Sequence, residues 1–115
     1  MRIAAIDLGS NSFHMLIAKT LGQSFETVLR ERMTIQIGKA ALASGRLDPG
    51  AMERGIRCMH EFRRLAMARR VERTFAVATS AIREAENGEE FIHRIGRTTG
   101  IAVRVIPGRE EARLI

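Results

Sequence analysis

The sequence has 115 residues, one cysteine and a formal net charge of +6. Hydrophobic residues make up 45% of it and charged residues 28%, which is typical of one globular domain and excludes a disordered or fibrous chain. A single cysteine excludes an internal disulfide, and no apolar run approaches the ~20 residues of a membrane-spanning helix. We therefore expect a cytoplasmic protein without a membrane partner.

The basic charge predicts an anionic partner. Aromatic residues make up only 4% of the sequence, with no Trp or Tyr, which argues against a protein that stacks bases on aromatic rings. From the charge alone, the partner could be a nucleic acid, an acidic membrane surface or a polyphosphorylated small molecule. We expect no specific nucleic-acid sequence as the partner.

The first third of the chain predicts three strands. Residues 2–7 form a short apolar run, residues 9–12 have turn chemistry, and residues 13–19 are the return arm of a hairpin. Met33, Ile35 and Ile37 recur at a spacing of two, which predicts a third strand within residues 24–37. Residues 38–47 are small and predict a loop.

Helices and strands alternate in the remainder. Asp48 and Pro49 predict the start of a helix, as the capping residue and the first helical residue. Its core-facing residues recur at spacings of three and four: Met52, Ile56, Met59, Phe62 and Ala66. We then expect a strand at 74–79 buried on both faces, a helical segment at 81–86, a helix at 89–98 ended by Gly100, a strand at 101–106 and a helix from 109.

The predicted order is therefore βββαβαβα, and the alternation implies parallel pairing of the later strands. The opening hairpin makes the five-stranded sheet mixed. This order is the one expected of a ribonuclease-H-like half-domain in the actin-like ATPase superfamily, an α/β fold.

One group of candidate site residues follows the first strand. Asp7 lies at the end of that strand, where α/β sheets present their ligands, and can hold Mg²⁺ directly or through water. The residues after it offer short side chains and backbone amides that can surround an anion: Gly9, Ser10, Asn11 and Ser12. The alternative is an ordinary polar hairpin turn, which uses the same residue types.

Two further groups follow later strands. Arg83 lies on the first turn after the strand at 74–79, where a guanidinium can hold a phosphate with two hydrogen bonds. The alternative is a plain helix cap at Thr79 or Ser80 with Arg83 in a surface ion pair. Glu110 and Glu111 begin the last helix, where the helix dipole alone favours carboxylates, or where one Glu can orient and deprotonate water.

Together these groups resemble a known family in order and spacing. The segments are Asp7-x-Gly-Ser-Asn-Ser-Phe13, Ala78-Thr-Ser-Ala-x-Arg-x-Ala-x-Asn87 and Pro107-Gly-x-Glu-Glu-Ala-x-Leu-Ile115. They resemble the Ppx/GppA family of exopolyphosphatases and guanosine pentaphosphate phosphohydrolases, and the resemblance covers essentially the whole chain. Sugar kinases and actin relatives share the first Asp-x-Gly turn, but the rest of the pattern looks like this family.

The resemblance implies a role for each group. Residues 9–12 would bind substrate phosphate, Asp7 would lie at the Mg²⁺ site, and Arg83 would bind a phosphate of the chain. Glu111 would be the general base that activates water, with Glu110 as its less suitable neighbour. The reaction would remove a terminal phosphate from inorganic polyphosphate or the γ-phosphate from guanosine pentaphosphate.

The family also carries a second phosphate loop, of the type Asp-x-Gly-Gly-Gly-Ser, and a second domain, and both are absent from this sequence. We therefore expect residues 1–115 to be a truncated N-terminal domain with little or no activity alone. The full-length protein could form a homodimer.

Two alternatives stay open, an actin-fold kinase or ATPase half-domain and a basic nucleic-acid-binding α/β module. The hydrolase interpretation requires Asp7, Arg83 and Glu111 to converge on one anion pocket.

Overall fold

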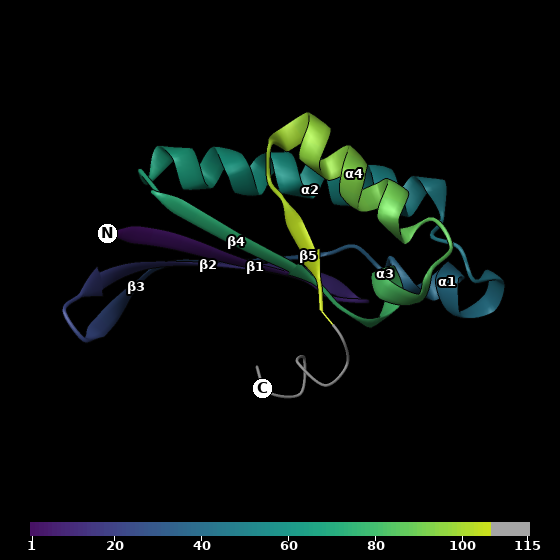
Figure 1. Cartoon of the computed structure of the whole chain (residues 1–115), viewed down its shortest axis with the longest axis horizontal. Coiled ribbons are helices and arrows are strands. Elements are labelled where there is room, and N and C mark those ends of the chain that lie inside the picture. Colours follow the sequence, from purple (N-terminus) through teal and green to yellow (C-terminus); the bar gives the residue numbers. More distant parts are fainter. Residues whose placement is uncertain (107–115) are drawn as a thin grey trace.

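A computed structural model describes residues 1–106, apart from the side chains of Leu42 and Ser80. Figure 1 shows the elements in chain order. They are β1 (Arg2–Leu8), β2 (Ser12–Leu21), β3 (Ser24–Thr34), α1 (Gly38–Ser44), α2 (Pro49–Ala68), β4 (Arg73–Ala78), α3 (Ser80–Glu84), α4 (Gly88–Thr99) and β5 (Val103–Val105).

The strands form one mixed sheet in the order β3-β2-β1-β4-β5. β1 pairs antiparallel with β2 and parallel with β4, so that Leu8 lies opposite both Phe13 and Ala78. β2 pairs antiparallel with β3, and β4 pairs parallel with β5. The predicted five-stranded mixed sheet and its opening hairpin are therefore confirmed.

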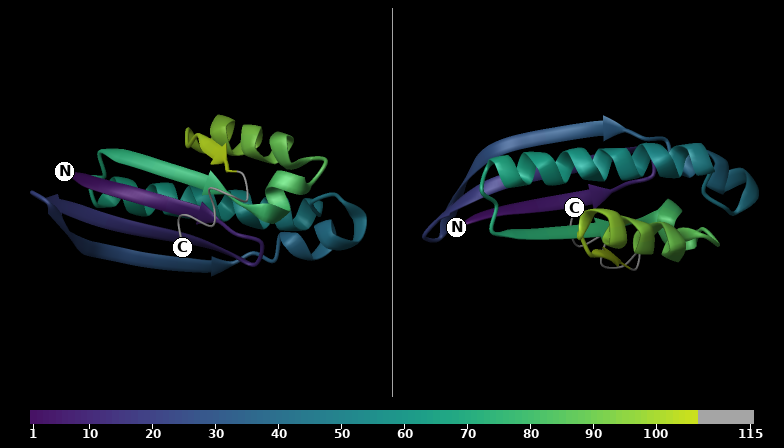
Figure 2. Two further views of the ribbon diagram at one scale, coloured as in Figure 1. Left: turned by 60° about the horizontal axis from the view of Figure 1, so that its bottom comes forward. Right: turned by 90° about the horizontal axis from the view of Figure 1, so that it is seen from above.

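The core lies between the sheet and the helices α2 and α4, which cover the same face of the sheet (Figures 1 and 2). Alternate residues of β1 point into it, because successive strand residues face opposite sides. The strand residues in the core are Ala4, Ile6, Leu8, Phe13, Met15, Ile17, Ala76 and Ala78, and the predicted apolar stripe of α2 packs on them. Both parallel crossovers run in the same direction along the sheet, so the right-handed rule places both helices on one face.

The prediction that β4 is buried on both faces was wrong. Phe75 of β4 is 54% exposed on the side away from α2, while Ala76 and Ala78 are buried beneath the helices. An apolar run does not distinguish a strand covered on both sides from one covered on one side, and within residues 1–106 the helices cover one side only.

Residues 35–45 also differ from the prediction. β3 ends at Thr34, because the backbone amides of Ile35 and Gln36 donate to the Asn11 carbonyl at 2.9 and 2.8 Å instead of continuing a strand. The expected loop contains helix α1, which the helix-forming residues 40–43 favour and which Gly45 ends at a φ of 77°. Ile37 is nevertheless fully buried, so the spacing of two identified core residues but not a strand.

Two predicted helix ends are confirmed, while the segment expected at 81–86 is a helix over Ser80–Glu84 and the helix expected from 109 lies outside the described residues. Asp48 caps α2 by accepting a hydrogen bond from the Ala51 amide at 3.1 Å, and Pro49 is the first helical residue. Gly100 ends α4 at a φ of 75°. None of the helices within residues 1–106 is both long enough and apolar enough to cross a membrane.

Candidate functional site

Three strands end side by side at one edge of the sheet. The parallel register aligns Leu8 of β1 with Ala78 of β4, and Ala78 with Val105 of β5. The Thr79 amide donates to the Leu8 carbonyl at 3.3 Å, and the Ile106 amide donates to the Ala78 carbonyl at 3.2 Å. The loop of residues 9–12 follows the first of these ends and α3 follows the second, so the first two predicted groups lie at the same edge.

Backbone hydrogen bonds hold the 9–12 loop in place. The Gly9 amide donates to the Ser12 carbonyl at 3.2 Å, and the Gly38 amide of α1 donates to the Ser10 carbonyl at 2.9 Å. A Cβ at position 9 would lie 3.0 Å from the Ser12 carbonyl oxygen, so this turn has little room for a side chain there. The loop is thus fixed on one side by its own closure and on the other by α1.

Ser12 supports the loop from inside the protein. It is 5% exposed, and its hydroxyl oxygen accepts hydrogen bonds from the side-chain nitrogen Nδ2 of Asn11 at 3.4 Å and from Arg32 Nε at 3.3 Å. Ser10 and Asn11 instead line a cavity. A ligand at the loop would therefore meet Ser10 and Asn11 first, with Ser12 orienting Asn11.

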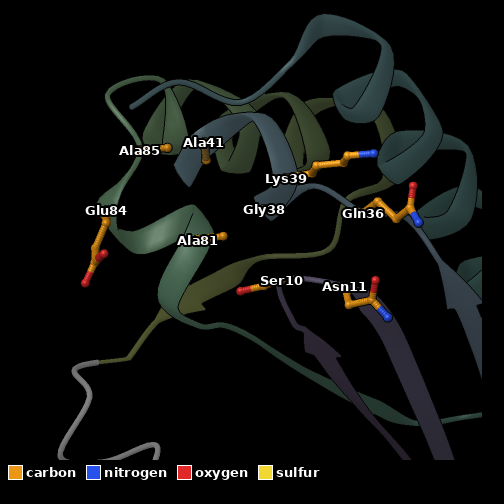
Figure 3. Close-up of a pocket in the computed structure, with 9 residues that line it drawn as sticks. All are labelled: Ser10, Asn11, Gln36, Gly38, Lys39, Ala41, Ala81, Glu84 and Ala85. Carbon is orange, nitrogen blue, oxygen red and sulfur yellow. The ribbon is translucent and has the colours of Figure 1, made fainter. Parts of the chain in front are cut away.

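The cavity has a volume of about 360 Å³ and lies between the 9–12 loop, α1 and α3 (Figure 3). Its lining residues are Ser10, Asn11, Gln36, Gly38, Lys39, Ala41, Ala81, Glu84 and Ala85. The three elements meet at Gly38, where a Cβ would lie 3.0 Å from the Ser10 Cβ and 3.2 Å from the Ala81 Cβ. Glycine therefore allows α1 and α3 to approach the loop closely.

Sequence reasoning missed Gln36, Gly38 and Lys39 as cavity residues. Gln36 has a φ of 58°, in the left-handed region that non-glycine residues adopt at a cost of about 1–3 kcal/mol. The helix-forming run between Gly38 and Gly45 was the signal for α1, but nothing in the residue spacing indicated that α1 would fold back onto the 9–12 loop.

Arg83 belongs to α3, and its side chain reaches the end of β5. Its side chain is 24% exposed, Nη1 donates to the Ile106 carbonyl at 3.0 Å, and Nη2 lies 3.7 Å from Glu84 Oε1. The Glu84 side chain is 74% exposed, so this ion pair adds little to stability. Thr79 is the N-cap residue of α3, as the alternative expected, but its hydroxyl donates to the Leu8 carbonyl and makes no capping hydrogen bond. The ion pair of Arg83 that the alternative also expected is present beside its backbone contact.

Asp7 lies at the same edge but on the uncovered face of the sheet. It is exposed and pairs with His14 in the register of β2. A hollow of about 500 Å³ on that face includes Asp7, His14 and Arg32 among its lining residues. Asp7 therefore lines this hollow and not the cavity between the 9–12 loop, α1 and α3.

Within residues 1–106, no three His, Cys, Asp or Glu side chains are grouped to hold a metal ion. Mg²⁺ does not need such a group, because one or two carboxylates with water and substrate phosphates complete its octahedral shell. The exposed Asp7 carboxylate at a strand end fits that arrangement. Glu110 and Glu111 lie outside the described residues, so the convergence of Asp7, Arg83 and Glu111 stays a prediction.

The fold and the position of the loop define a class of protein. The sheet order and helix placement are those of a ribonuclease-H-like half-domain. Thermus thermophilus RuvC shares the fold at 13% identity, with a TM-score of 0.52 over 91% of this chain and 60% of that one.

A narrower relationship comes from the sequence profile of the Ppx/GppA phosphatase family, which matches residues 16–115. The chain belongs to this family. A family member from Aquifex aeolicus is 37% identical, with a TM-score of 0.94 over 98% of this chain. An exopolyphosphatase from Cytophaga hutchinsonii is 34% identical, with a TM-score of 0.96 over 100% of this chain. The chain spans 37% of the length of each of these two proteins.

Proposed function

We propose that this chain forms part of an enzyme that hydrolyses phosphoanhydride bonds. The substrates would be inorganic polyphosphate, which loses its terminal phosphate, or guanosine pentaphosphate, which loses its γ-phosphate. Membership of the family and similarity to the exopolyphosphatase support this proposal. The observation that carries it is the common edge of β1, β4 and β5, where backbone contacts fix the 9–12 loop and Arg83.

The described residues would act by positioning and by charge. Ser10 and Asn11 would donate hydrogen bonds to phosphate oxygens, and Arg83 would hold a neighbouring phosphate through its guanidinium. Phosphoryl transfer depends mainly on such groups, because its transition state spreads negative charge over oxygens and asks for little covalent chemistry. Asp7 would hold Mg²⁺, and the ion when bound would neutralise charge on the phosphate oxygens.

The water would be oriented by Glu111. The oxygen of the water attacks the terminal phosphorus, and one proton of the water passes to the Glu111 carboxylate. The bond from that phosphorus to the bridging oxygen breaks. The products are inorganic phosphate and a chain shorter by one phosphate. A Glu with an ordinary pKa is a weak base, so its value would lie mostly in placing the water.

The test is Glu111→Gln in the complete protein, with phosphate release measured on polyphosphate and on guanosine pentaphosphate. Glutamine keeps the size of the side chain but cannot accept the proton. We expect kcat to fall by about 10²–10⁴-fold, the usual contribution of a general base, with KM changed little. Glu110→Gln is the matched control and should retain most of the activity. Normal hydrolysis by the Glu111→Gln enzyme would show that the general-base assignment is wrong.

A further inference from the structure

A hollow lies at the end of the sheet opposite the 9–12 loop. It has a volume of about 460 Å³ and is lined by Met1, Arg2, Lys19, Arg70 and Glu72. Its lining residues come from the start of β1, from β2 and from the link between α2 and β4, and Figures 1 and 2 show that the start of β1 lies beside this link. We call it the cationic hollow after Arg2, Lys19 and Arg70.

Hydrogen bonds between β1 and the α2–β4 link, together with the β1–β2 register, bring these three cations together. Arg2 Nη1 donates to the Arg69 carbonyl at 2.8 Å, and the Glu72 amide donates to the Arg2 carbonyl at 2.8 Å, so the α2–β4 link is tied to β1. Arg70 lies between these two tethers. Arg2 and Lys19 are directly opposite each other in the antiparallel register of β1 and β2.

This arrangement has an electrostatic cost. Like charges directly opposite each other on neighbouring strands are destabilising. Within the part of the chain that the structure describes, no carboxylate lies within 4.0 Å of the cationic groups of Arg2, Lys19 or Arg70, and Glu72 supplies one negative charge nearby. A bound anion would relieve this repulsion.

The dipole of α2 explains only part of the cluster. Cations are favourable near the C-terminal end of a helix, which accounts for arginine directly after Ala68. Arg2 and Lys19 belong to strands and are not explained in this way. Arg70 has a φ of 56°, where glycine would be less strained, so the backbone does not favour arginine at this position.

We propose that the cationic hollow binds distal phosphates of a long inorganic polyphosphate chain whose terminal phosphate lies at the 9–12 loop. This inference rests on the proposed function. The seven residues of β1 separate the two places by ~20 Å at a strand rise of ~3.3 Å per residue. None of the residues lining the hollow is aromatic, so nucleic-acid bases would find no stacking partner there.

The experiment measures equilibrium binding of long-chain inorganic polyphosphate to the 115-residue chain. The variant is Lys19→Thr/Arg70→Gly, because threonine suits a strand and glycine suits the φ of position 70. The matched control is Arg57→Gln/Arg97→Gln, which removes the same charge from two exposed arginines elsewhere. We expect the first variant to bind roughly tenfold more weakly, a difference of about 1.4 kcal/mol, because two cationic contacts to phosphate are lost, and we expect the control to change little. Circular dichroism checks that all the proteins are folded.

Three results would overturn the inference. Unchanged binding by Lys19→Thr/Arg70→Gly would exclude the hollow, and an equal loss in the control would show attraction by net charge alone. Single-stranded DNA that binds as tightly as polyphosphate through the same two residues would indicate a nucleic-acid site. Binding needs no turnover, so failure here with normal hydrolysis in the complete protein would leave the proposed function standing, and the reverse result would leave the hollow standing.

Discussion

Gly55 of α2 is the point at which a helix approaches two buried aromatic rings. A Cβ at this position would lie 2.8 Å from Phe91 Cζ of α4 and 3.1 Å from Phe13 Cε2 of β2. The two rings are fully buried, with centroids 6.5 Å apart. Close contact between α2, α4 and the sheet therefore depends on glycine, which has no side chain, at this position.

We predict that Gly55→Ala lowers the free energy of unfolding by about 1–3 kcal/mol, because the added methyl group overpacks the core. Gly96→Ala in α4 is the matched control. The nearest atom to a Cβ there is 3.8 Å away, so the gain in helix propensity should raise stability by about 0.5–1 kcal/mol. Denaturant unfolding measures both variants. Equal stability of the two would contradict the close packing at Gly55.

Because of Cys58, the stability of the folded protein depends on pH in the alkaline range. Burial, and secondarily the Glu61 carboxylate, raise the pKa of the Cys58 thiol from 9.0 to about 12. As the pH rises, the thiol therefore loses its proton in the unfolded chain before it does so in the folded one. The contribution of this group to the free energy of unfolding is complete below pH 9 and is lost as the pH rises toward 12.

We predict that the free energy of unfolding of the unmodified protein falls more steeply above pH 9 than that of Cys58→Ala. The difference in slope should approach about 1.4 kcal/mol per pH unit, the value for one proton. Unfolding in urea at several alkaline pH values measures it. Parallel curves for the two proteins would show that the thiol ionises equally in both states.

At the scale of elements, Asn87 joins two connections that are far apart in sequence. Its side-chain oxygen accepts a hydrogen bond from the Leu47 amide at 2.7 Å, and its side-chain nitrogen donates to the Leu47 carbonyl at 3.1 Å. The side chain is buried between the α1–α2 link and the start of α4. It therefore helps to set the position of α1 and, through α1, the cavity beside the 9–12 loop.

We predict that Asn87→Ala lowers the free energy of unfolding by about 2–4 kcal/mol, because two buried backbone groups of Leu47 lose their partners. The control is Glu86→Ala at the neighbouring position, whose ion pair with Arg46 is exposed and worth less than about 1 kcal/mol. Thermal or denaturant unfolding checks both. A loss for Asn87→Ala no larger than that for Glu86→Ala would show that the amide bridge carries little energy.

The elements with strong local signals were predictable from the sequence. The Asp48 cap, the apolar stripe of α2 and the glycine stop at position 100 predicted their helices. α1 was not predicted, although residues 40–43 are helix-forming, and neither was the end of β3 at Thr34. The position of α1 and the end of β3 depend on hydrogen bonds to the 9–12 loop, which is distant in sequence from them, and local periodicity carries no information about such contacts.

At the scale of the whole molecule, the same sheet order determines where each candidate site residue lies. Parallel pairing of β1, β4 and β5 could be inferred from the alternation of helices and strands, and it brings the 9–12 loop and Arg83 to one edge. The sequence did not indicate that Asp7 faces the uncovered side of the sheet and does not line the cavity between the 9–12 loop, α1 and α3. That outcome follows from both helical crossovers lying on one face.

The candidate phosphate contacts within residues 1–106 are the 9–12 loop and Arg83, which both lie at the ends of β1, β4 and β5. Catalysis of phosphoryl transfer needs groups held around the substrate, because most of its rate enhancement comes from orientation and preorganised charge. We therefore predict that the 115-residue chain binds polyphosphate but releases no phosphate above the enzyme-free blank. A colorimetric phosphate assay measures this, with the complete protein at equal concentration as the control. Robust turnover by the 115-residue chain would mean that its own residues form a sufficient catalytic site, so that the second phosphate loop expected from the family is not required for the reaction.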